Sequence, residues 1–283
     1  MNPLASTSHA SEGLTPGIMN IQLVYLPFGE SRLSDGLLSV ALMCVAPDSR
    51  ARILRFRHSD DKWRCLIGRL LPRRLLTDCG IRADSVVIKT SQGGKPFVAE
   101  PAGCFSFNVT HDSNFVAMAY STAHLAIGID IMKCEVPQGE TVESYLNALS
   151  GFLTASERRQ LEKDIGDSGF VIERLYEYWT TKEAYTKALG IGVGFDFARI
   201  ECRWKSDDSA AHVIAVDGAE IRGWEFRGLR WTRDGHRYLC MAAISSGTPD
   251  ETHISWTELD ERTEWVQNID VFSLLARARP LTD

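Results

Sequence analysis

The run from Phe170 to Leu189 constrains the fold most, because it contains neither proline nor glycine. Apolar residues recur in it at three- and four-residue spacing, at Val171, Leu175, Tyr178, Tyr185 and Leu189. This spacing predicts a long amphipathic helix, and Gly190 predicts the point where the helix ends. We take this helix and the glycine-rich run after it, residues 190–196, as the centre of the candidate site.

Charged residues on this helix have two interpretations. Glu183 and Lys187 are four residues apart, so a carboxylate and an ammonium group share one edge of the helix. Such a pair is also the common bridge of an exposed helix, worth only about 0.2–0.5 kcal/mol. Lys182 is less ordinary, because it falls on the apolar stripe between Tyr178 and Tyr185. A lysine there needs an anion or must extend to solvent.

The composition is that of a globular chain. It has 283 residues, of which 44% are hydrophobic, enough to bury a large core. No run approaches the roughly 18 apolar residues of a membrane span. Residues 1–18 lack the basic start and apolar centre of a signal peptide, so we expect a cytoplasmic location and no membrane partner.

The seven cysteines are scattered and never form a C-x-x-C pair. An odd, scattered set indicates reduced thiols rather than a disulfide framework or a zinc site.

Positive charge is concentrated between residues 50 and 74, although the net charge of the chain is −6. We predict a helix that Ser59 caps, with Arg64 and Arg69 off its apolar stripe and a kink or end at Pro72. This basic segment fits a solvated face, a phosphate site or a surface for an acidic partner, and Arg69 and Arg73 are candidates for the last role. The negative net charge argues against a nucleic-acid-binding protein.

Strands are predicted for several segments of the first half: 21–28, 37–45, 85–89, 105–109 and 115–120. A glycine turn at Gly93 and Gly94 follows the third of these segments and would let the backbone approach a ligand. Asn108 and His111 would lie at or near the turn after the fourth, where functional residues often occur.

A further strand is predicted for residues 125–132, with Gly128 and Asp130 on the same face. A carboxylate in such an apolar strand is costly unless it is paired or binds a metal ion. Asp130 could therefore be a metal ligand, or its carboxylate could be held by a cap or a salt bridge.

The second half alternates between helix and strand signals. Thr154 and Glu157 have the spacing of a capping box, and a hairpin turn is predicted at Asp234 and Gly235. Strands are predicted at 198–204, 212–216, 221–231 and 237–244. The segment after Ser245 is predicted to be a polar tail that lies on the surface of the folded domain. The fold class is therefore α+β.

Three motifs occur together in this order: F-N-V-T-H within residues 105–111, G-I-D-I-M-K at 128–133, and W-x-x-K-E-x-x-x-K at 179–187. In this combination the chain resembles the Sfp-type 4'-phosphopantetheinyl transferases over residues 20–245. The matches at 68–70, 94–96, 128–133 and 190–201 are most similar to the branch of the human aminoadipate-semialdehyde dehydrogenase phosphopantetheinyl transferase.

The resemblance implies two similar α+β subdomains related by a pseudo-two-fold axis, with coenzyme A in the cleft between them. The expected domains are a flexible N-terminus (1–18), an N-terminal subdomain (19–124), a C-terminal subdomain (125–245) and a C-terminal tail (246–283). The implied reaction is Mg²⁺-dependent transfer of 4'-phosphopantetheine from coenzyme A to a serine of a carrier protein, with release of adenosine 3',5'-bisphosphate. The implied partners are apo acyl carrier protein or carrier domains of fatty acid, polyketide or aminoadipate-type synthases.

The resemblance also assigns roles to residues. Asp130 and Glu183 match the metal ligands, Lys187 would offset charge on the phosphates, and Glu183 would be metal ligand, base or both. The matching coenzyme A residues are Arg52, Lys95, Asn108, Val109, Thr110, His111 and Lys187.

The chain departs from the bacterial pattern at Met132, where a third acid is common, and in the loop residues Thr90 and Gly93. The alternative from another class is a non-catalytic coenzyme A or nucleotide-binding module, which would not need Asp130 and Glu183 together.

Overall fold

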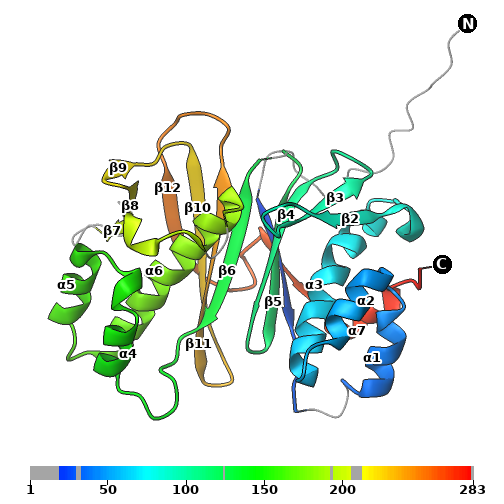
Figure 1. The fold of residues 1–283 in the computed structure, drawn as a ribbon, viewed down its shortest axis with the longest axis horizontal. Helices are drawn as coiled ribbons and strands as arrows, with labels where there is room; N and C mark the ends of the chain where they lie inside the picture. Colours follow the sequence, from blue (N-terminus) through cyan, green and yellow to red (C-terminus); the bar gives the residue numbers. More distant parts are fainter. Residues whose placement is uncertain (1–18, 30–32, 124, 192–193, 205–211, 282–283) are drawn as a thin grey trace, which may run out of the picture.

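Two four-stranded sheets stand side by side, with helices on the outer side of each (Figure 1). The computed structural model describes residues 19–29, 33–123, 125–191, 194–204 and 212–281. The predicted flexible N-terminus, residue 124 at the predicted subdomain boundary, and residues 192–193 of the glycine-rich run lie outside these ranges. The mixed α and β content agrees with the predicted class.

The first sheet has the strand order β13-β1-β5-β4. Its strands are β1 (Asn20–Tyr25), β4 (Ser106–Asp112), β5 (Phe115–Ser121) and β13 (Val266–Ile269). The helices of this half are α1 (Asp35–Leu42), α2 (Pro47–Leu54), α3 (Ser59–Asp78) and α7 (Val271–Arg277), and a two-stranded hairpin is formed by β2 (Val87–Thr90) and β3 (Pro96–Glu100).

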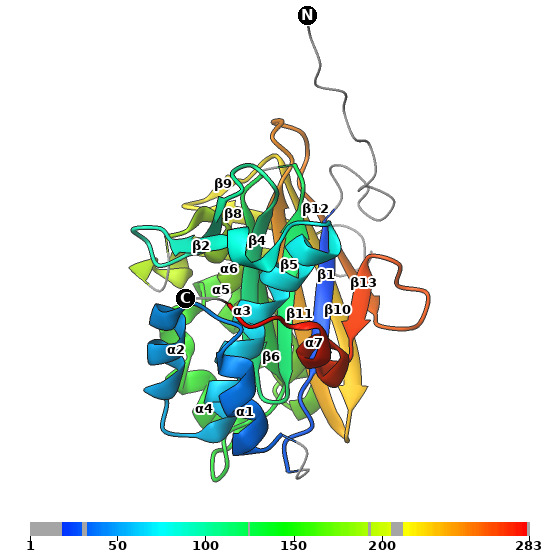
Figure 2. The ribbon, with the colours of Figure 1, turned by 90° about the vertical axis from the view of Figure 1, so that its right-hand side faces the viewer.

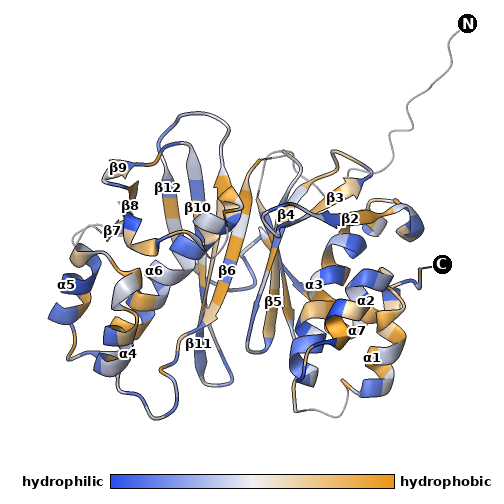
Figure 3. Ribbon diagram, in the orientation of Figure 1, coloured by the Kyte–Doolittle hydropathy of each residue, from blue (hydrophilic) through white to orange (hydrophobic). Residues whose placement is uncertain are grey.

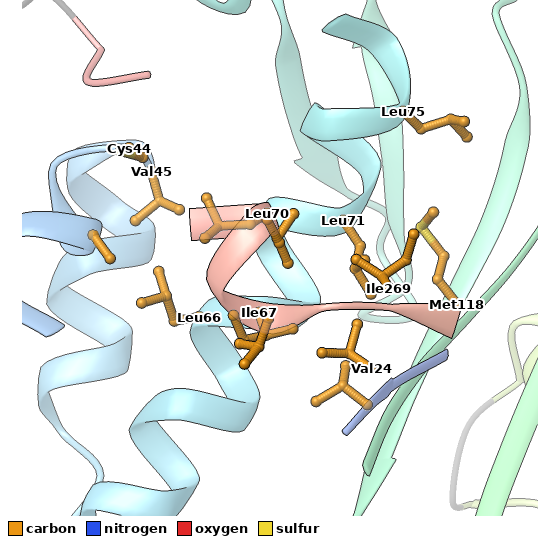
Figure 4. Close-up of a cluster of buried hydrophobic side chains, with 14 of the residues drawn as sticks. Val24, Cys44, Val45, Leu66, Ile67, Leu70, Leu71, Leu75, Met118 and Ile269 are labelled. Atoms are coloured by element: carbon orange, nitrogen blue, oxygen red, sulfur yellow. The ribbon is translucent and has the colours of Figure 1, made fainter. Parts of the chain in front are cut away.

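Helix α3 provides most of the core of this half. Its apolar side chains pack between the sheet and the other helices, and Figure 4 shows Leu71 of α3 beside Ile269 of β13 and Met118 of β5. Burial of a leucine or isoleucine side chain contributes about 1.5–3 kcal/mol.

Two predictions about α3 were wrong in detail. The N-cap is His58 rather than Ser59, and no side chain caps the helix. Of the two outcomes predicted at Pro72, a kink or an end, the end is wrong, because the helix continues through Pro72 to Asp78. A proline inside a helix costs about 3 kcal/mol, and the leucines buried on both sides of it, Leu71 and Leu75 among them, offset that cost.

The strand predicted for residues 37–45 is helix α1. Ser34 caps this helix by accepting a hydrogen bond from the backbone N of Leu37, at 3.3 Å. Leu38, Ala41 and Leu42 are then buried together. A short apolar run has no distinct period, so sequence alone does not separate a strand from a buried helix here.

The second sheet has the strand order β12-β10-β11-β6. Its strands are β6 (Ile127–Lys133), β10 (Trp224–Arg233), β11 (His236–Ser245) and β12 (His253–Glu258). A small sheet of β7 (Ile200–Trp204), β8 (His212–Val216) and β9 (Ala219–Glu220) and the helices α4 (Val142–Ala148), α5 (Ala155–Lys163) and α6 (Ser168–Leu189) complete this half.

Local predictions in this half are confirmed. Helix α6 ends at Gly190, which is left-handed with φ 72°. The Thr154–Glu157 capping box is formed. Asp234 and Gly235 both have positive φ, as a two-residue hairpin turn requires.

The prediction of a polar tail after Ser245 was wrong, because this segment forms two strands of the sheets. Strand β12 pairs in parallel with β10, and β13 pairs in parallel with β1, so this segment adds a strand to each sheet. Trp256 of β12 covers Gly228 of β10, where an added Cβ would lie 2.2 Å from the indole ring. Such contacts join residues far apart in the chain, so no local pattern predicts them.

The two sheets share an apolar layer. One face of β6 packs Ile127, Ile129 and Ile131 against Ala117 and Ala119 of β5. Figure 3 shows β5 and β6 as largely hydrophobic strands in the middle of the molecule. The opposite face of β6 points to α6. Among the described residues, no helix combines the length and apolarity needed to cross a bilayer.

Candidate active site

Strands β4 and β6 are joined where the two halves meet. The Asn108 side-chain oxygen accepts a hydrogen bond from the backbone N of Ile129 at 3.0 Å. The Asp112 carboxylate accepts one from the backbone N of Lys133 at 2.7 Å. These bonds hold Thr110 and His111, which lie between the two anchors on β4 rather than in the predicted turn.

Gly128 brings helix α6 onto β6. A Cβ at this position would lie 2.0 Å from the backbone O of Ala184 and 2.4 Å from the backbone N of Ala188. No residue other than glycine fits such a contact without moving the helix. The close approach places Lys187 of α6 beside Asp130 of β6.

Asp130 is buried, with 5% of its surface exposed. Its Oδ1 accepts hydrogen bonds from Lys187 Nζ at 2.6 Å and from Thr110 Oγ1 at 3.2 Å. Its Oδ2 is buried and has no hydrogen-bond partner among the described residues. Burial raises the pKa of Asp130, and the Lys187 cation opposes this effect. The carboxylate therefore has one oxygen paired and one available.

Glu183 lies one helical turn before Lys187 and is half-buried. Burial raises the pKa of Glu183, Lys187 lowers it, and the nearby Asp130 charge raises it further. The described part of the chain contains no ion pair between Glu183 and Lys187, since Lys187 is paired with Asp130. The ordinary helix-surface bridge considered from the sequence is therefore not formed.

The two acids fit a magnesium ion. Mg²⁺ prefers oxygen ligands and is usually held by one or two carboxylates, with water and substrate phosphates at its other positions. The unpaired Oδ2 of Asp130 and the Glu183 carboxylate match that donor set. Among the described residues no group of three or more His, Cys, Asp and Glu side chains could hold a metal ion alone.

Lys95 comes from the tip of the β2–β3 hairpin. Its ammonium group donates hydrogen bonds to the backbone oxygens of Ile127 at 2.7 Å, Lys187 at 3.0 Å and Ala188 at 3.1 Å. Burial lowers the pKa of Lys95 to about 8. This predicted coenzyme A residue thus lies between the two halves, at the end of α6.

A pocket of about 280 Å³ lies in the first half, and its wall is strongly basic. It is formed by α2, α3, the β2–β3 hairpin and β4, and it brings together the predicted residues Arg52, Val109 and His111. Arg64, Arg69 and Arg73 of α3 also line it.

The pocket changes the interpretation of the basic segment. Arg73 is 9% exposed and donates a hydrogen bond to the backbone O of Val86 at 3.1 Å, so it is not a surface residue for a partner. The Nε atom of Arg69 is buried without a hydrogen-bond partner among the described residues. The sequence placed Arg64 and Arg69 off the apolar stripe, but it did not indicate that the arginines of α3 line a pocket.

His111 lies on the pocket wall and is close enough to Lys187 to be affected by its charge. The His111 side chain is exposed at this wall, but desolvation by the atoms around it lowers its pKa, and the cations Arg64 and Lys187 lower it further. The imidazole is therefore neutral at pH 7 and becomes a better cation when an anion enters the pocket.

Lys182, the lysine on the apolar stripe of α6, forms a buried ion pair. Lys182 Nζ lies 2.6 Å from Glu157 Oε2, and both side chains are 1% exposed. Lys182 also donates to the backbone oxygens of Phe152 and Phe197. This confirms the expectation that Lys182 needs an anion, and it attaches α6 to α5.

Comparisons with known proteins cover both halves. The family model described as "4'-phosphopantetheinyl transferase, N-terminal" matches residues 33–123, and the model "4'-phosphopantetheinyl transferase superfamily" matches residues 126–240. The chain is 36% identical over 252 residues to the 4'-phosphopantetheinyl transferase pptA of Paxillus involutus, covering 85% of this chain and 92% of the relative.

Two further relatives have related names. The phosphopantetheinyl transferase of Thraustochytrium sp. is 34% identical over 189 residues, which are 64% of each chain. The human L-aminoadipate-semialdehyde dehydrogenase-phosphopantetheinyl transferase is 25% identical over 218 residues, 72% of this chain and 68% of the relative.

Proposed function

Because this chain belongs to the 4'-phosphopantetheinyl transferase superfamily, we propose that it modifies apo carrier proteins in a Mg²⁺-dependent reaction. The hydroxyl oxygen of a carrier serine attacks the β-phosphorus of coenzyme A. The bond from this phosphorus to the bridging oxygen breaks, phosphopantetheine stays on the serine, and adenosine 3',5'-bisphosphate leaves with the electron pair of the broken bond.

The observation that carries this proposal is the arrangement of two acids and one cation at the junction of the halves. Asp130 has one carboxylate oxygen paired with Lys187 and one unpaired. Glu183 stands close enough to Asp130 for the charge of Asp130 to raise the pKa of Glu183. Asp130 and Glu183 would hold Mg²⁺, which would supply positive charge to offset that of the substrate phosphates.

Glu183 also accepts the serine proton, directly or through a water. Lys187 offsets the charge that develops on the leaving phosphate. Its present bond to Asp130 keeps it at the place where that charge appears.

The basic pocket receives the nucleotide part of coenzyme A. Arg52 and His111 face it, and Arg64 and Arg69 add charge beyond the residues that the resemblance assigns to coenzyme A. Phosphates are bound well by arginine and by imidazolium. Asn108 and Thr110 hold the strand between this pocket and Asp130 in register.

The proposed pseudo-two-fold arrangement has support in the strand order. The segments β1–α3–β4–β5 and β6–α6–β10–β11 follow the same order along the chain. In both segments the last strand, β5 or β11, lies between the first strand and the second strand and pairs with each of them antiparallel. The reaction centre lies where these two segments meet. The expected location of the protein is the cytoplasm.

The experiment that tests the function uses the complete protein, coenzyme A, Mg²⁺ and several apo carriers. The carriers come from fatty acid, polyketide and aminoadipate-type synthases, and intact-mass spectrometry follows them. We expect at least one to gain a single phosphopantetheine on its serine. A serine-to-alanine carrier is the matched control. A lack of modification on all of them, with correctly folded carriers, would contradict the proposal.

A further inference from the structure

The Lys95 ammonium group has no free donor. A lysine ammonium group carries three N–H donors, and the backbone oxygens of Ile127, Lys187 and Ala188 lie 2.7, 3.0 and 3.1 Å from its Nζ. Two of these oxygens belong to the last turn of α6, where a cation is favourable, although the Lys187 oxygen also accepts a hydrogen bond from the backbone N of Gly190. The third belongs to the start of β6.

The hairpin that carries Lys95 is seated on the same helix end. A Cβ on Gly93 would lie 2.5 Å from the backbone O of Gly190, so the hairpin and the C-cap of α6 touch through their backbones. Figure 2 shows the tip of the β2–β3 hairpin reaching the segment that follows α6. This backbone contact does not involve the Lys95 side chain, and it also places the β2–β3 hairpin against the end of α6.

The two elements that Lys95 joins carry the reacting pair. The oxygen of Lys187 is one of its acceptors, and the side chain of Lys187 forms the 2.6 Å bond to Asp130. Ile127 is three residues before Asp130 on β6. A shift of either element at the Lys95 contact would therefore move Lys187 relative to Asp130.

We propose that Lys95 is a positioning residue, which fixes the end of α6 against β6 so that Lys187 and Asp130 face the reacting phosphate, and that it does not bind a coenzyme A phosphate itself. This inference rests on the proposed transferase function for its effect on rate. Its structural part stands on the three hydrogen bonds and the Gly93 contact.

The chemistry of the acceptors separates the two roles of Lys95. Three carbonyl oxygens that converge on one nitrogen suit a tetrahedral ammonium group, and the planar fork of a guanidinium group does not reproduce that arrangement. A phosphate site, in contrast, accepts arginine well, because guanidinium binds phosphate with two parallel hydrogen bonds. Lys95→Arg therefore distinguishes a positioning residue from a phosphate ligand, and Lys95→Met removes both possibilities.

The experiment compares Lys95→Met, Lys95→Arg and the matched control Lys89→Met, an exposed lysine of the same hairpin. We expect both Lys95 variants to lower kcat about tenfold, with the dissociation constant of coenzyme A, measured without Mg²⁺, within about twofold of the wild type. The control should match the wild type. A tenfold or larger rise of that dissociation constant in Lys95→Met, with full activity in Lys95→Arg, would overturn the proposal.

Hydrogen exchange gives a readout that does not depend on activity. Without any ligand, Lys95→Met should exchange the backbone amides of residues 184–191 faster than Lys89→Met does. An unchanged rate would overturn the proposal even if the transferase reaction is absent, so the two failures are distinguishable. If Lys95→Met does not fold, Gly93→Ala serves instead, because its methyl group separates the hairpin from Gly190 while Lys95 keeps its charge.

Discussion

The contact between β6 and α6 at Gly128 gives the most demanding prediction. An alanine there would place its Cβ 2.0 Å from the backbone O of Ala184, and real Cβ atoms do not approach other atoms closer than 3.0 Å. Helix α6 must therefore retreat by about 1 Å. Overpacking of this kind costs about 1–3 kcal/mol of stability. A displacement of about 1 Å at a reacting group costs about 100-fold in rate.

Two assays on Gly128→Ala test this reasoning. Urea unfolding should show the loss of about 1–3 kcal/mol, and carrier modification at saturating coenzyme A should slow about 100-fold. The matched control is Gly169→Ala, in the first turn of the same helix, where the added Cβ makes only an ordinary contact of 3.6 Å. A Gly128→Ala protein with unchanged stability and rate would refute the idea that this close approach positions Lys187.

Three further predictions concern single side chains. Lys187→Ala should weaken coenzyme A binding about tenfold or more even without metal, since a hydrogen bond from a charged group contributes about 1.5–3 kcal/mol; equilibrium binding in a chelator measures this, and unchanged binding would contradict it. His111 has a pKa below its ordinary 6.5. An anion that binds beside the imidazole raises this pKa, because it favours the protonated form. The affinity for coenzyme A should therefore rise as the pH falls from 7, and titration calorimetry should show a weaker pH dependence in His111→Ala than in the wild type. Lys182→Met leaves the buried Glu157 without its cation and should cost about 3–5 kcal/mol in urea unfolding; a loss below about 1 kcal/mol would show that the pair does not hold α6 in place.

The same His111 has a defined effect on stability. Its folded-state pKa is lowered, so the unfolded chain binds the proton more readily. This contribution reduces stability as the pH falls below about 6.5, and it is absent above that value.

The sequence predicted what depends on neighbours along the chain. The period of residues 170–189 and the left-handed Gly190 are local properties, and so is the alternation that put Asp130 and Gly128 on one face. The motif resemblance then brought Asp130, Glu183 and Lys187 to one site. The structure places Asp130 and Lys187 in direct contact.

What the sequence missed depends on contacts between distant segments. The run around Leu38 has no clear period, and only packing against α3 decides that it is helical. Strands β12 and β13 find partners more than twenty residues away, in β10 and β1. The direction in which Arg73 points, and the acceptors that occupy Lys95, follow from how the hairpin and α3 are placed.

The proposed reaction depends most on Glu183, which is assigned both to Mg²⁺ binding and to acceptance of the serine proton. Glu183→Gln keeps the size of the side chain and its capacity for hydrogen bonds, but it removes the charge that Mg²⁺ binding and proton acceptance both require.

The most direct test is therefore the rate at which Glu183→Gln modifies an apo carrier, measured over a range of Mg²⁺ concentrations at saturating coenzyme A. We expect the rate to fall at least about 100-fold at every Mg²⁺ concentration, as is usual for loss of an acid–base group. Wild-type turnover with an unchanged Mg²⁺ dependence would contradict the assignment of Glu183 to the metal and to the serine proton.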